Sequence, residues 1–184
     1  MTTAAVVLAA GGGRRFAGGA KVLAPFRGRP LVAWAVEAAV AAGLDETIVV
    51  VGDTSLDGAV PAAVTVVVND GWADGIATSL QAGVAAADAR GHDAVVVGLA
   101  DQPLVPASAW SAVAASASPI AVATYDGRRR NPVRLARVVW PLLPATGDGG
   151  ARTVIGERPD LVAEVRCVGD PTDVDTTADL EALV

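Results

Sequence analysis

The sequence predicts an α/β protein with a mostly parallel sheet and helices on both of its faces. Short, uninterrupted apolar runs alternate along the chain with longer helical segments, and such runs are typical of strands buried on both faces. Hydrophobic residues make up 52% of the 184 residues and aromatic residues only 4%, so small side chains allow helices to pack closely on the sheet. Because no repeat or long linker divides the chain, we expect one domain over residues 1–184.

The first half of the chain, about residues 1–105, has the predicted order β-α-β-β-α-β. The expected strands are residues 4–10, 46–52, 63–69 and 93–100, and the expected helices are 30–43 and 75–87. Pro30 suits the first turn of a helix, and Gly43 suits a C-terminal cap. Parallel sheets bind ligands beyond the carboxyl ends of their strands, so we expect the site where residues 11–21, 71–75 and 101–103 follow strands.

The second half, about residues 106–184, has a looser pattern. We expect a helix at 107–116, a strand at 119–125, a charged turn at 126–132, a helix at 133–143, a helix beginning in the glycine-rich segment 147–157, a strand at 161–167 and a terminal helix at 176–184. Thr176 or Thr177 is the expected N-cap of the last helix, because a threonine hydroxyl accepts a hydrogen bond from the first turn.

Charge and composition exclude several classes of function. The formal net charge of −6 argues against a broad nucleic-acid surface, which is usually basic. No apolar stretch reaches the roughly 20 residues of a membrane span and no signal-peptide pattern opens the chain, so we expect a cytoplasmic protein that binds neither nucleic acid nor membranes. The one cysteine, Cys167, fits a reduced structural thiol. The one histidine, His92, precedes a strand at the end opposite the expected site, which argues against histidine catalysis.

The segment LAAGGGRRFAGGAK, residues 8–21, follows the first strand with glycines, two arginines and a lysine. Glycines let backbone amides approach a phosphate, and Arg14, Arg15 and Lys21 supply positive charge, so the loop suits an anion. It matches neither the dinucleotide pattern, which needs glycine at Phe16, nor the phosphate-loop pattern, which needs Ser or Thr after the lysine. A plain strand-to-helix connection with solvated arginines stays open as the alternative.

A carboxylate marks a second candidate, in the segment VVVGLADQPLV. Here Asp101 stands at the carboxyl end of a buried strand, followed two residues later by Pro103. This position suits Mg²⁺, a hard cation that prefers oxygen ligands and retains waters and substrate phosphates. An Asx-type turn formed by Asp101 is the alternative.

Six segments, taken in order, resemble one known family. LAAG with its glycines, Arg and Lys, then NDGWADGIATSLQAG, LADQP, RNPV, TGDGGAR and DVDTTADL are similar to the molybdenum cofactor nucleotidyltransferases, above all the cytidylyltransferase branch, from Val7 to Leu180. The resemblance implies a three-layer α/β/α Rossmann-like nucleotidyltransferase fold. It also implies Mg²⁺-dependent transfer of a nucleotide from a nucleoside triphosphate to the terminal phosphate of a molybdopterin-type cofactor, with release of pyrophosphate. The LAAG form favours CTP over GTP.

The resemblance carries roles onto particular residues of this chain. Nucleotide contacts are implied for Leu8, Ala9, Ala10, Gly11, Gly13, Lys21 and Ser79, and phosphate-binding or metal-binding catalytic roles for Arg15, Lys21 and Asp101. Such a reaction needs no protein nucleophile, because a metal and cations relieve the negative charge at the α-phosphorus. For the segment around Trp72, the alternative to a nucleotide-binding role is that Asp70 or Asp74 caps the following helix.

The second half is implied to bind the acceptor, with Asn131, Asp148 and Arg152 as its contacts. Asp148 and Arg152 flank two glycines at an expected helix N-terminus, which favours an anionic phosphate. Asp175 is either a second metal ligand or the cap of the last helix. The implied partners are the triphosphate, a pterin phosphate, and a molybdoenzyme or its maturation chaperone.

The chain departs from the family pattern at three positions. Lys21 lies one residue further along than usual, which makes Ala17 look like an insertion, while Arg130 replaces a common glycine and Arg134 replaces an apolar or aromatic residue.

Two other functions stay open. One is an NAD(P)H-dependent quinone or nicotine-blue-type reductase on the same fold, which the missing G-x-G-x-x-G disfavours. The other is a catalytically inactive cofactor-binding protein, which the retained Lys21 and Asp101 disfavour.

Overall fold

A seven-stranded sheet with the strand order β5-β4-β1-β6-β8-β7-β9 organises the computed structural model, which describes residues 1–11, 16 and 20–183. The strands are β1 (Thr3–Leu8), β4 (Glu46–Val51), β5 (Thr65–Val68), β6 (Ala94–Leu99), β7 (Ile120–Tyr125), β8 (Arg128–Ala136) and β9 (Val162–Arg166), and a separate short pair is formed by β2 (Pro25–Phe26) and β3 (Arg29–Pro30). Neighbours among β5, β4, β1 and β6 are parallel, as are β7 and β9, whereas β8 is antiparallel to β6 and β7.

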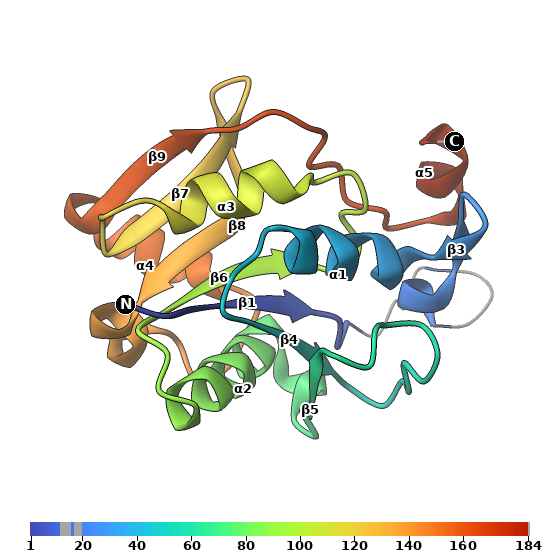
Figure 1. Cartoon of the computed structure of the whole chain (residues 1–184), viewed down its shortest axis with the longest axis horizontal. Helices are drawn as coiled ribbons and strands as arrows, with labels where there is room; N and C mark the ends of the chain where they lie inside the picture. The colour runs from blue at the N-terminus through green and yellow to red at the C-terminus, as the bar shows by residue number, and fades with distance from the viewer. Residues whose placement is uncertain (12–15, 17–19, 184) are drawn as a thin grey trace.

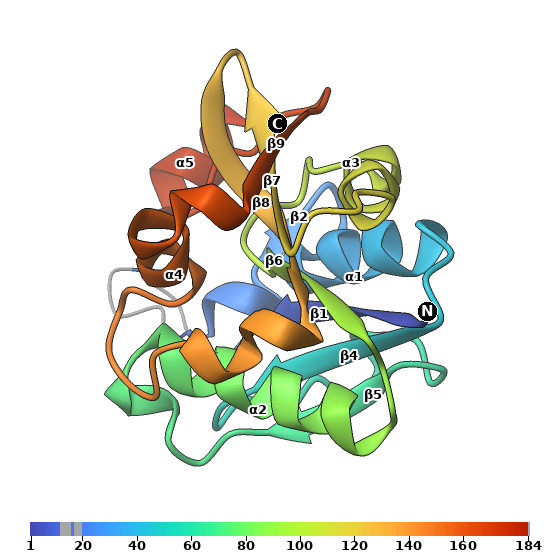
Figure 2. The same ribbon diagram turned by 90° about the vertical axis from the view of Figure 1, so that its left-hand side faces the viewer.

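Helices cover both faces of this sheet (Figures 1 and 2). One face carries α1 (Leu31–Ala41) and α3 (Ala107–Ala114), and the other carries α2 (Ile76–Ala89) and α4 (Ala151–Glu157), while α5 (Thr177–Ala182) lies beside β2 and β3. Short 3₁₀ helices are η1 (Lys21–Leu23), η2 (Trp72–Asp74), η3 (Arg137–Leu142) and η4 (Pro159–Leu161). The expected mostly parallel sheet with helices on both faces is confirmed.

Small residues let the helices approach the sheet. A Cβ added at Gly83 of α2 would lie 2.6 Å from Val6 Cγ1, and one added at Gly98 of β6 would lie 2.5 Å from the Trp110 ring of α3. Trp110 is 2% exposed and belongs to the apolar cluster on the α1 and α3 face. Each face of the sheet therefore has its own apolar cluster, packed against glycines, alanines and valines.

The expected helix at 133–143 is wrong. Residues 133–136 continue β8, and Val133 of this strand pairs with Val97 of β6. Only residues 137–142 are helical, and they form the 3₁₀ helix η3. Val133 and Leu135 point into one apolar cluster, while the Arg134 guanidinium is buried and donates to Ser118 O at 2.6 Å. This alternation has the period of a strand. The charged turn expected at 126–132 likewise shortens to a turn at Asp126–Gly127, because residues 128–132 are also part of β8.

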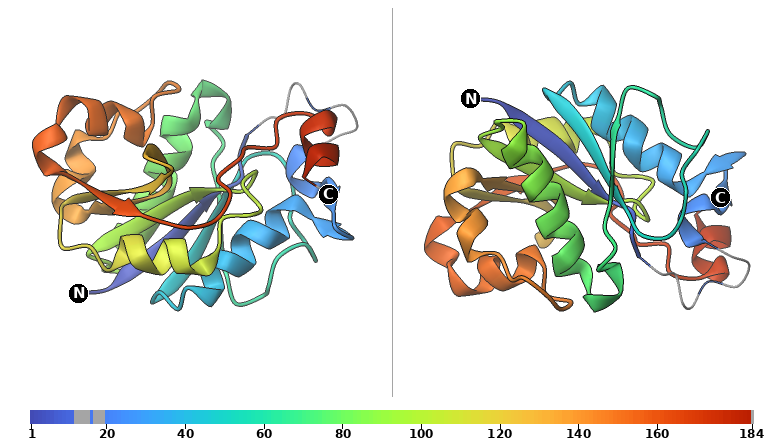
Figure 3. Two further views of the ribbon diagram at one scale, coloured as in Figure 1. Left: turned by 90° about the horizontal axis from the view of Figure 1, so that it is seen from above. Right: turned by 90° about the horizontal axis from the view of Figure 1, so that it is seen from below.

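The segment after β9 returns to the carboxyl ends of β1 and β6 before it forms α5 (Figure 3, left). Val174 is fully buried with Phe26 and Leu31, which anchors the segment. Thr176 is confirmed as the N-cap of α5: its hydroxyl accepts from Asp179 N, and the Asp179 side chain accepts from Thr176 N in a capping box.

None of the helices in the described part of the chain combines the length and apolar composition that a membrane crossing requires. Cys167 is partly buried, and its Sγ donates a hydrogen bond to Val165 O at 3.4 Å. Burial raises the pKa of this thiol, which keeps it protonated and fits a structural role.

Gly98→Ala is expected to destabilise the protein by about 1–3 kcal/mol, because the new methyl group overlaps the Trp110 ring in a packed core. Gly156→Ala is the control, since a Cβ there meets nothing within 4 Å and alanine favours the α4 helix by roughly 0.5–1 kcal/mol. Urea unfolding of both variants measures these differences. Equal stability of the Gly98→Ala variant and the parent would contradict the close packing of α3 on β6.

Candidate functional site

A cavity of about 380 Å³ opens at the carboxyl ends of β1 and β6. Its lining residues are Leu8, Ala9, Ala10, Gly11, Lys21, Val22, Trp72, Ala73, Gly75, Ile76, Ser79, Leu99, Ala100, Asp101 and Asp148, and we call it the first cavity. From β1 the chain passes through α1 on one face to β4, whereas β6 is reached through α2 on the other face. The first cavity therefore lies at the point where the strand order reverses, the usual ligand site of an open α/β sheet.

Most of the expected nucleotide-binding residues lie together in this cavity. Leu8, Ala9, Ala10, Gly11, Lys21, Ser79 and Asp101 all line it. Gly13, Arg14 and Arg15 lie outside the described residues, as does Ala17. The lining comes from the end of β1, from η1, from α2 and from the end of β6, so only the fold brings these residues together.

The end of β1 is held by two main-chain hydrogen bonds beyond the strand. Ala9 N donates to Val50 O at 2.8 Å, and Ala100 N donates to Leu8 O at 3.0 Å. Ala9 and Ala10 are buried, and their side chains are single methyl groups. The first cavity is thus walled at this point by main chain and methyl groups in fixed positions, a surface that suits a flat ligand.

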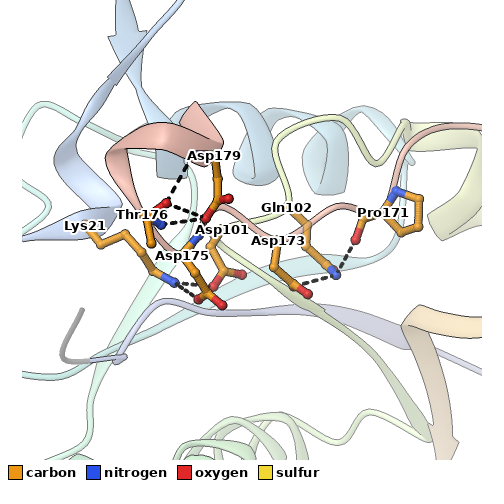
Figure 4. Close-up of polar contacts among 8 residues, drawn as sticks. All are labelled: Lys21, Asp101, Gln102, Pro171, Asp173, Asp175, Thr176 and Asp179. Atoms are coloured by element: carbon orange, nitrogen blue, oxygen red, sulfur yellow. Dashed lines mark hydrogen bonds and ion pairs between the residues drawn. The ribbon is translucent and has the colours of Figure 1, made fainter. Parts of the chain in front are cut away.

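Lys21, the one lysine of the chain, is the charged centre of the site. Its buried side chain places Nζ 2.6 Å from Asp101 Oδ2 and 3.3 Å from Asp175 Oδ1 (Figure 4). Burial acts to lower the pKa of Lys21, but the charges of Asp101 and Asp175 and their hydrogen bonds outweigh burial and raise the pKa above 10.5. Lys21 is therefore a fixed positive charge at neutral pH.

The carboxylates around Lys21 suit a divalent cation that arrives with its substrate. Asp101 Oδ1 is buried and accepts no hydrogen bond from the described residues. The described part of the chain contains no group of three or more His, Cys, Asp or Glu side chains placed to hold a metal. Two carboxylates, Asp101 and Asp175, are enough for a hard cation such as Mg²⁺ when waters and phosphates complete its coordination. The two carboxylates therefore fit a divalent cation whose remaining ligands are waters or phosphate oxygens.

Ser79 is placed by a buried asparagine. Asn69 Nδ2 donates to Ser79 Oγ at 3.0 Å and to Thr78 Oγ1 at 2.9 Å, which fixes both hydroxyls in the first turns of α2. The capping alternative for Asp70 and Asp74 is wrong, because the N-cap of α2 is Gly75 and no side chain caps it. The N-terminus of α2 instead borders the first cavity directly.

Asp148 lies in the first cavity, whereas the sequence led us to expect it among the acceptor contacts. The cause is the close approach of two glycines: a Cβ at Gly75 would lie 2.5 Å from the carbonyl carbon of Gly147. Ala77 N donates to Gly147 O, and Gly147 N donates to Asp74 O. These bonds tie the loop before α4 to the N-terminus of α2 and bring Asp148 to the first cavity.

A second cavity of about 400 Å³ adjoins the first and shares Leu8, Ile76 and Leu99 with it. The other lining residues are Leu80, Val97, Gln102, Val122, Arg129, Arg130, Asn131, Val133, Gly149, Gly150, Ala151, Arg152, Ile155 and Asp173. Two expected acceptor residues, Asn131 and Arg152, therefore line the same cavity. Among the described residues, neither Arg130 nor Arg152 forms an ion pair with a carboxylate, whereas Arg129 pairs with Glu164 at 2.7 Å.

His92 lies away from both cavities. Its Nε2 is 2.9 Å from Glu46 Oε2, at the edge of the sheet where β4 and β6 begin. Arg134 also lies outside the cavities, within β8, so of the two arginine departures only Arg130 borders a candidate ligand site.

Sequence reasoning missed Gln102, which lines the second cavity and bonds the segment that carries Asp175. The available signal was a polar side chain directly after Asp101, at the end of a buried strand. Arg129, which also lines the second cavity, was missed as well, since residues 126–132 were expected to form only a charged turn.

Comparisons with known proteins agree with this geometry. Residues 5–162 match the family model described as the MobA-like NTP transferase domain. The nicotine blue oxidoreductase of Paenarthrobacter nicotinovorans is 33% identical over an alignment of 195 residues, gaps included. This alignment covers 97% of this chain and 95% of that protein. Rv0371c of Mycobacterium tuberculosis H37Rv, solved as a complex with manganese, is 29% identical, with a TM-score of 0.83 and coverage of 100% of this chain and 98% of that chain.

A nucleotidyl transferase from Methanothermobacter superposes with a TM-score of 0.84 at 24% identity, covering 99% of this chain and 95% of that chain. At this identity the likeness concerns the fold. The sheet and its helices form the nucleotide-diphospho-sugar transferase-like α/β fold, so the three-layer nucleotidyltransferase fold implied by the sequence is confirmed.

The pKa of Lys21 is expected to lie above 10.5, and Asp101→Asn should lower it, because burial stays while the nearest opposite charge is removed. NMR of the lysine side chain measures this without overlap, since the chain has one lysine. Because the folded-state pKa is raised, the contribution of these ion pairs to stability is fully present below pH 10.5 and is lost as the pH rises through the folded-state pKa. An unchanged lysine pKa in the Asp101→Asn variant would contradict the ion pair.

Proposed function

The chain belongs to the MobA-like NTP transferase domain family, and from that premise we propose that it transfers CMP from CTP to the terminal phosphate of a molybdopterin-type acceptor. The general class, nucleotidyl transfer, follows from the family. The observation that carries the proposal is the cluster of Lys21, Asp101 and Asp175 at the first cavity. A buried cation beside two carboxylates suits a triphosphate that binds together with a divalent metal ion.

In the proposed complex, the nucleotide occupies the first cavity. Ala9 and Ala10 lie near the base, Gly11 follows them along the loop, and Ser79 offers its hydroxyl to the ribose or a phosphate. Lys21 holds the phosphates, together with Gly13 and Arg15 of the loop. Asp101 and Asp175 hold Mg²⁺, which when bound neutralises charge on the phosphates; the manganese complex of the mycobacterial relative supports a divalent ion. The small LAAG turn supports CTP over GTP.

The acceptor is proposed to occupy the second cavity. The apolar lining of this cavity suits a flat ring system. The side chains of Arg130, Arg152 and Asn131 suit the phosphate of the acceptor. A phosphate oxygen of the acceptor forms a bond to the α-phosphorus, the bond from that phosphorus to the pyrophosphate oxygen breaks, and pyrophosphate leaves with the electron pair. No side chain acts as a nucleophile, so the residues contribute by positioning and by compensating negative charge.

The two cavities meet at Leu8, Ile76 and Leu99, which is where the reacting groups would come together. Both belong to what we propose is a single domain over residues 1–184. We also propose that the reaction takes place in the cytoplasm, with Mg²⁺ as the usual metal, and that the product passes to a molybdoenzyme or its maturation chaperone.

A reductase is the second candidate, because a relative with 33% identity over nearly the whole chain is named a nicotine blue oxidoreductase. A reductase of this kind would bind NADH or NADPH without a metal ion. The site favours the transferase, since the glycine loop lacks the dinucleotide pattern and the cluster around Lys21 provides donors for a cation and for phosphates. Reduction of a quinone or of nicotine blue by NAD(P)H tests this candidate directly.

Asp101→Asn is expected to reduce pyrophosphate release with CTP, Mg²⁺ and a molybdopterin acceptor by roughly 100-fold or more, because charge compensation at the α-phosphate is lost. Asp160→Asn is the matched control: it also removes a carboxylate from an ion pair, but with Arg158 at the surface. Near-parent activity of the Asp101→Asn variant would remove Asp101 from the mechanism.

Arg152→Ala is expected to raise KM for the acceptor and to leave CTP binding nearly unchanged, because Arg152 lines only the second cavity. The lost charge-assisted hydrogen bonds correspond to about 1.5–3 kcal/mol, or roughly 10- to 100-fold in KM. Arg158→Ala, at the other end of α4, is the control. The reverse pattern, weaker CTP binding with an unchanged acceptor KM, would contradict the separation of the two subsites.

A further inference from the structure

Gln102 is buried beside the site and hydrogen-bonds a distant segment of the chain. It is 2% exposed, directly follows Asp101, and its Nε2 donates to Pro171 O and to Asp173 Oδ1, both at 2.9 Å (Figure 4). The orientation of the amide is unambiguous, because a proline carbonyl can only accept a hydrogen bond. Both hydrogens of the amide are therefore used to hold residues 171–173.

The main chain strengthens the same contact. Val174 N donates to Asp101 O at 2.9 Å, and Asp170 N donates to Leu104 O at 3.4 Å. Residues 170–174 have no helix or strand of their own between β9 and α5. Among the described residues, Gln102 is the one side chain from outside this segment that hydrogen-bonds it. Residues 101–104 thus hold the segment by hydrogen bonds, in addition to the burial of Val174.

The segment delivers a carboxylate to the site at its end. Val174 is fully buried, and the next residue, Asp175, reaches Lys21 at 3.3 Å. Gln102 also carries a cost, since its Oε1 is buried and accepts no hydrogen bond from the described residues. A buried, unsatisfied oxygen lowers stability, and the two hydrogen bonds that Nε2 donates to Pro171 O and Asp173 Oδ1 offset this cost.

We infer that Gln102 is a positioning residue, which holds residues 171–174 so that the Asp175 carboxylate lies beside Asp101 and Lys21. The inference rests on the proposed function, in which Asp101 and Asp175 hold the metal ion of the bound nucleotide. In this role Gln102 acts through Asp175, because both hydrogens of its amide are donated to residues 171 and 173. Its loss should weaken metal binding only as far as Asp175 contributes to that binding.

Gln102→Leu tests this inference, because leucine keeps much of the volume and removes both donors. Hydrogen exchange of the peptide that contains residues 170–176 should become faster. The affinity for Mn²⁺ in the presence of CTP should fall roughly 10- to 100-fold, as is usual when a residue that orients a metal ligand is removed. In an Asp175→Asn background the same substitution should cause no further loss, because residues that act as one unit are not additive.

Gln81→Leu is the matched control. Gln81 Nε2 also donates to two carbonyls, Leu143 O at 3.1 Å and Pro144 O at 3.2 Å, but it lines neither cavity. It should change neither the exchange of residues 170–176 nor Mn²⁺ affinity.

Two results would overturn the role of Gln102: unchanged exchange of residues 170–176 in Gln102→Leu, or an equal loss of Mn²⁺ affinity in the parent and Asp175→Asn backgrounds. If the parent itself binds no Mn²⁺ with CTP, the proposed function fails, and the exchange experiment still decides whether Gln102 holds the segment.

Discussion

The ion cluster of Lys21 with Asp101 and Asp175 joins three distant parts of the chain. Asp101 is 80 residues from Lys21 in sequence and Asp175 is 154 residues away. A buried ammonium group is costly to desolvate, and this cost is offset only when its partners are held in place. The end of β6 provides one partner, and the segment before α5 provides the other. Much of the surrounding structure, including the capping box of α5 and the burial of Val174, serves to keep the partners at these positions.

The antiparallel strand β8 explains how two adjoining subsites arise on one sheet. β8 pairs with β6 on one side and with β7 on the other, so the second half of the chain extends the sheet begun by the first half. Asn131 of β8 and Arg152 of α4 thereby line the cavity that shares a wall with the cavity at β1. In the proposed reaction this shared wall is the place where the acceptor phosphate meets the nucleotide.

Local patterns predicted the parallel part of the fold because its strands are short apolar runs, such as residues 4–8, that alternate with longer helical segments. They failed at β8, where Arg134 and Arg137 resemble the polar face of a helix; only pairing with β6 and β7 shows that Arg134 is buried within a sheet. In the site, glycines and Asp101 could be recognised from their place after strands. The placement of Asp148 and the role of Gln102 could not, because both depend on hydrogen bonds to residues about 70 positions away.

The most direct test of the central claim is calorimetric titration of the protein with CTP, GTP, NADH and NADPH, each with and without Mg²⁺. Two carboxylates, Asp101 and Asp175, would repel the negative charge of a triphosphate unless a cation lies between them. The account therefore predicts saturable CTP binding that requires Mg²⁺, weaker binding of GTP, and no binding of the nicotinamide dinucleotides. Metal-independent binding of NADH or NADPH, together with no binding of either triphosphate, would contradict it and favour the reductase.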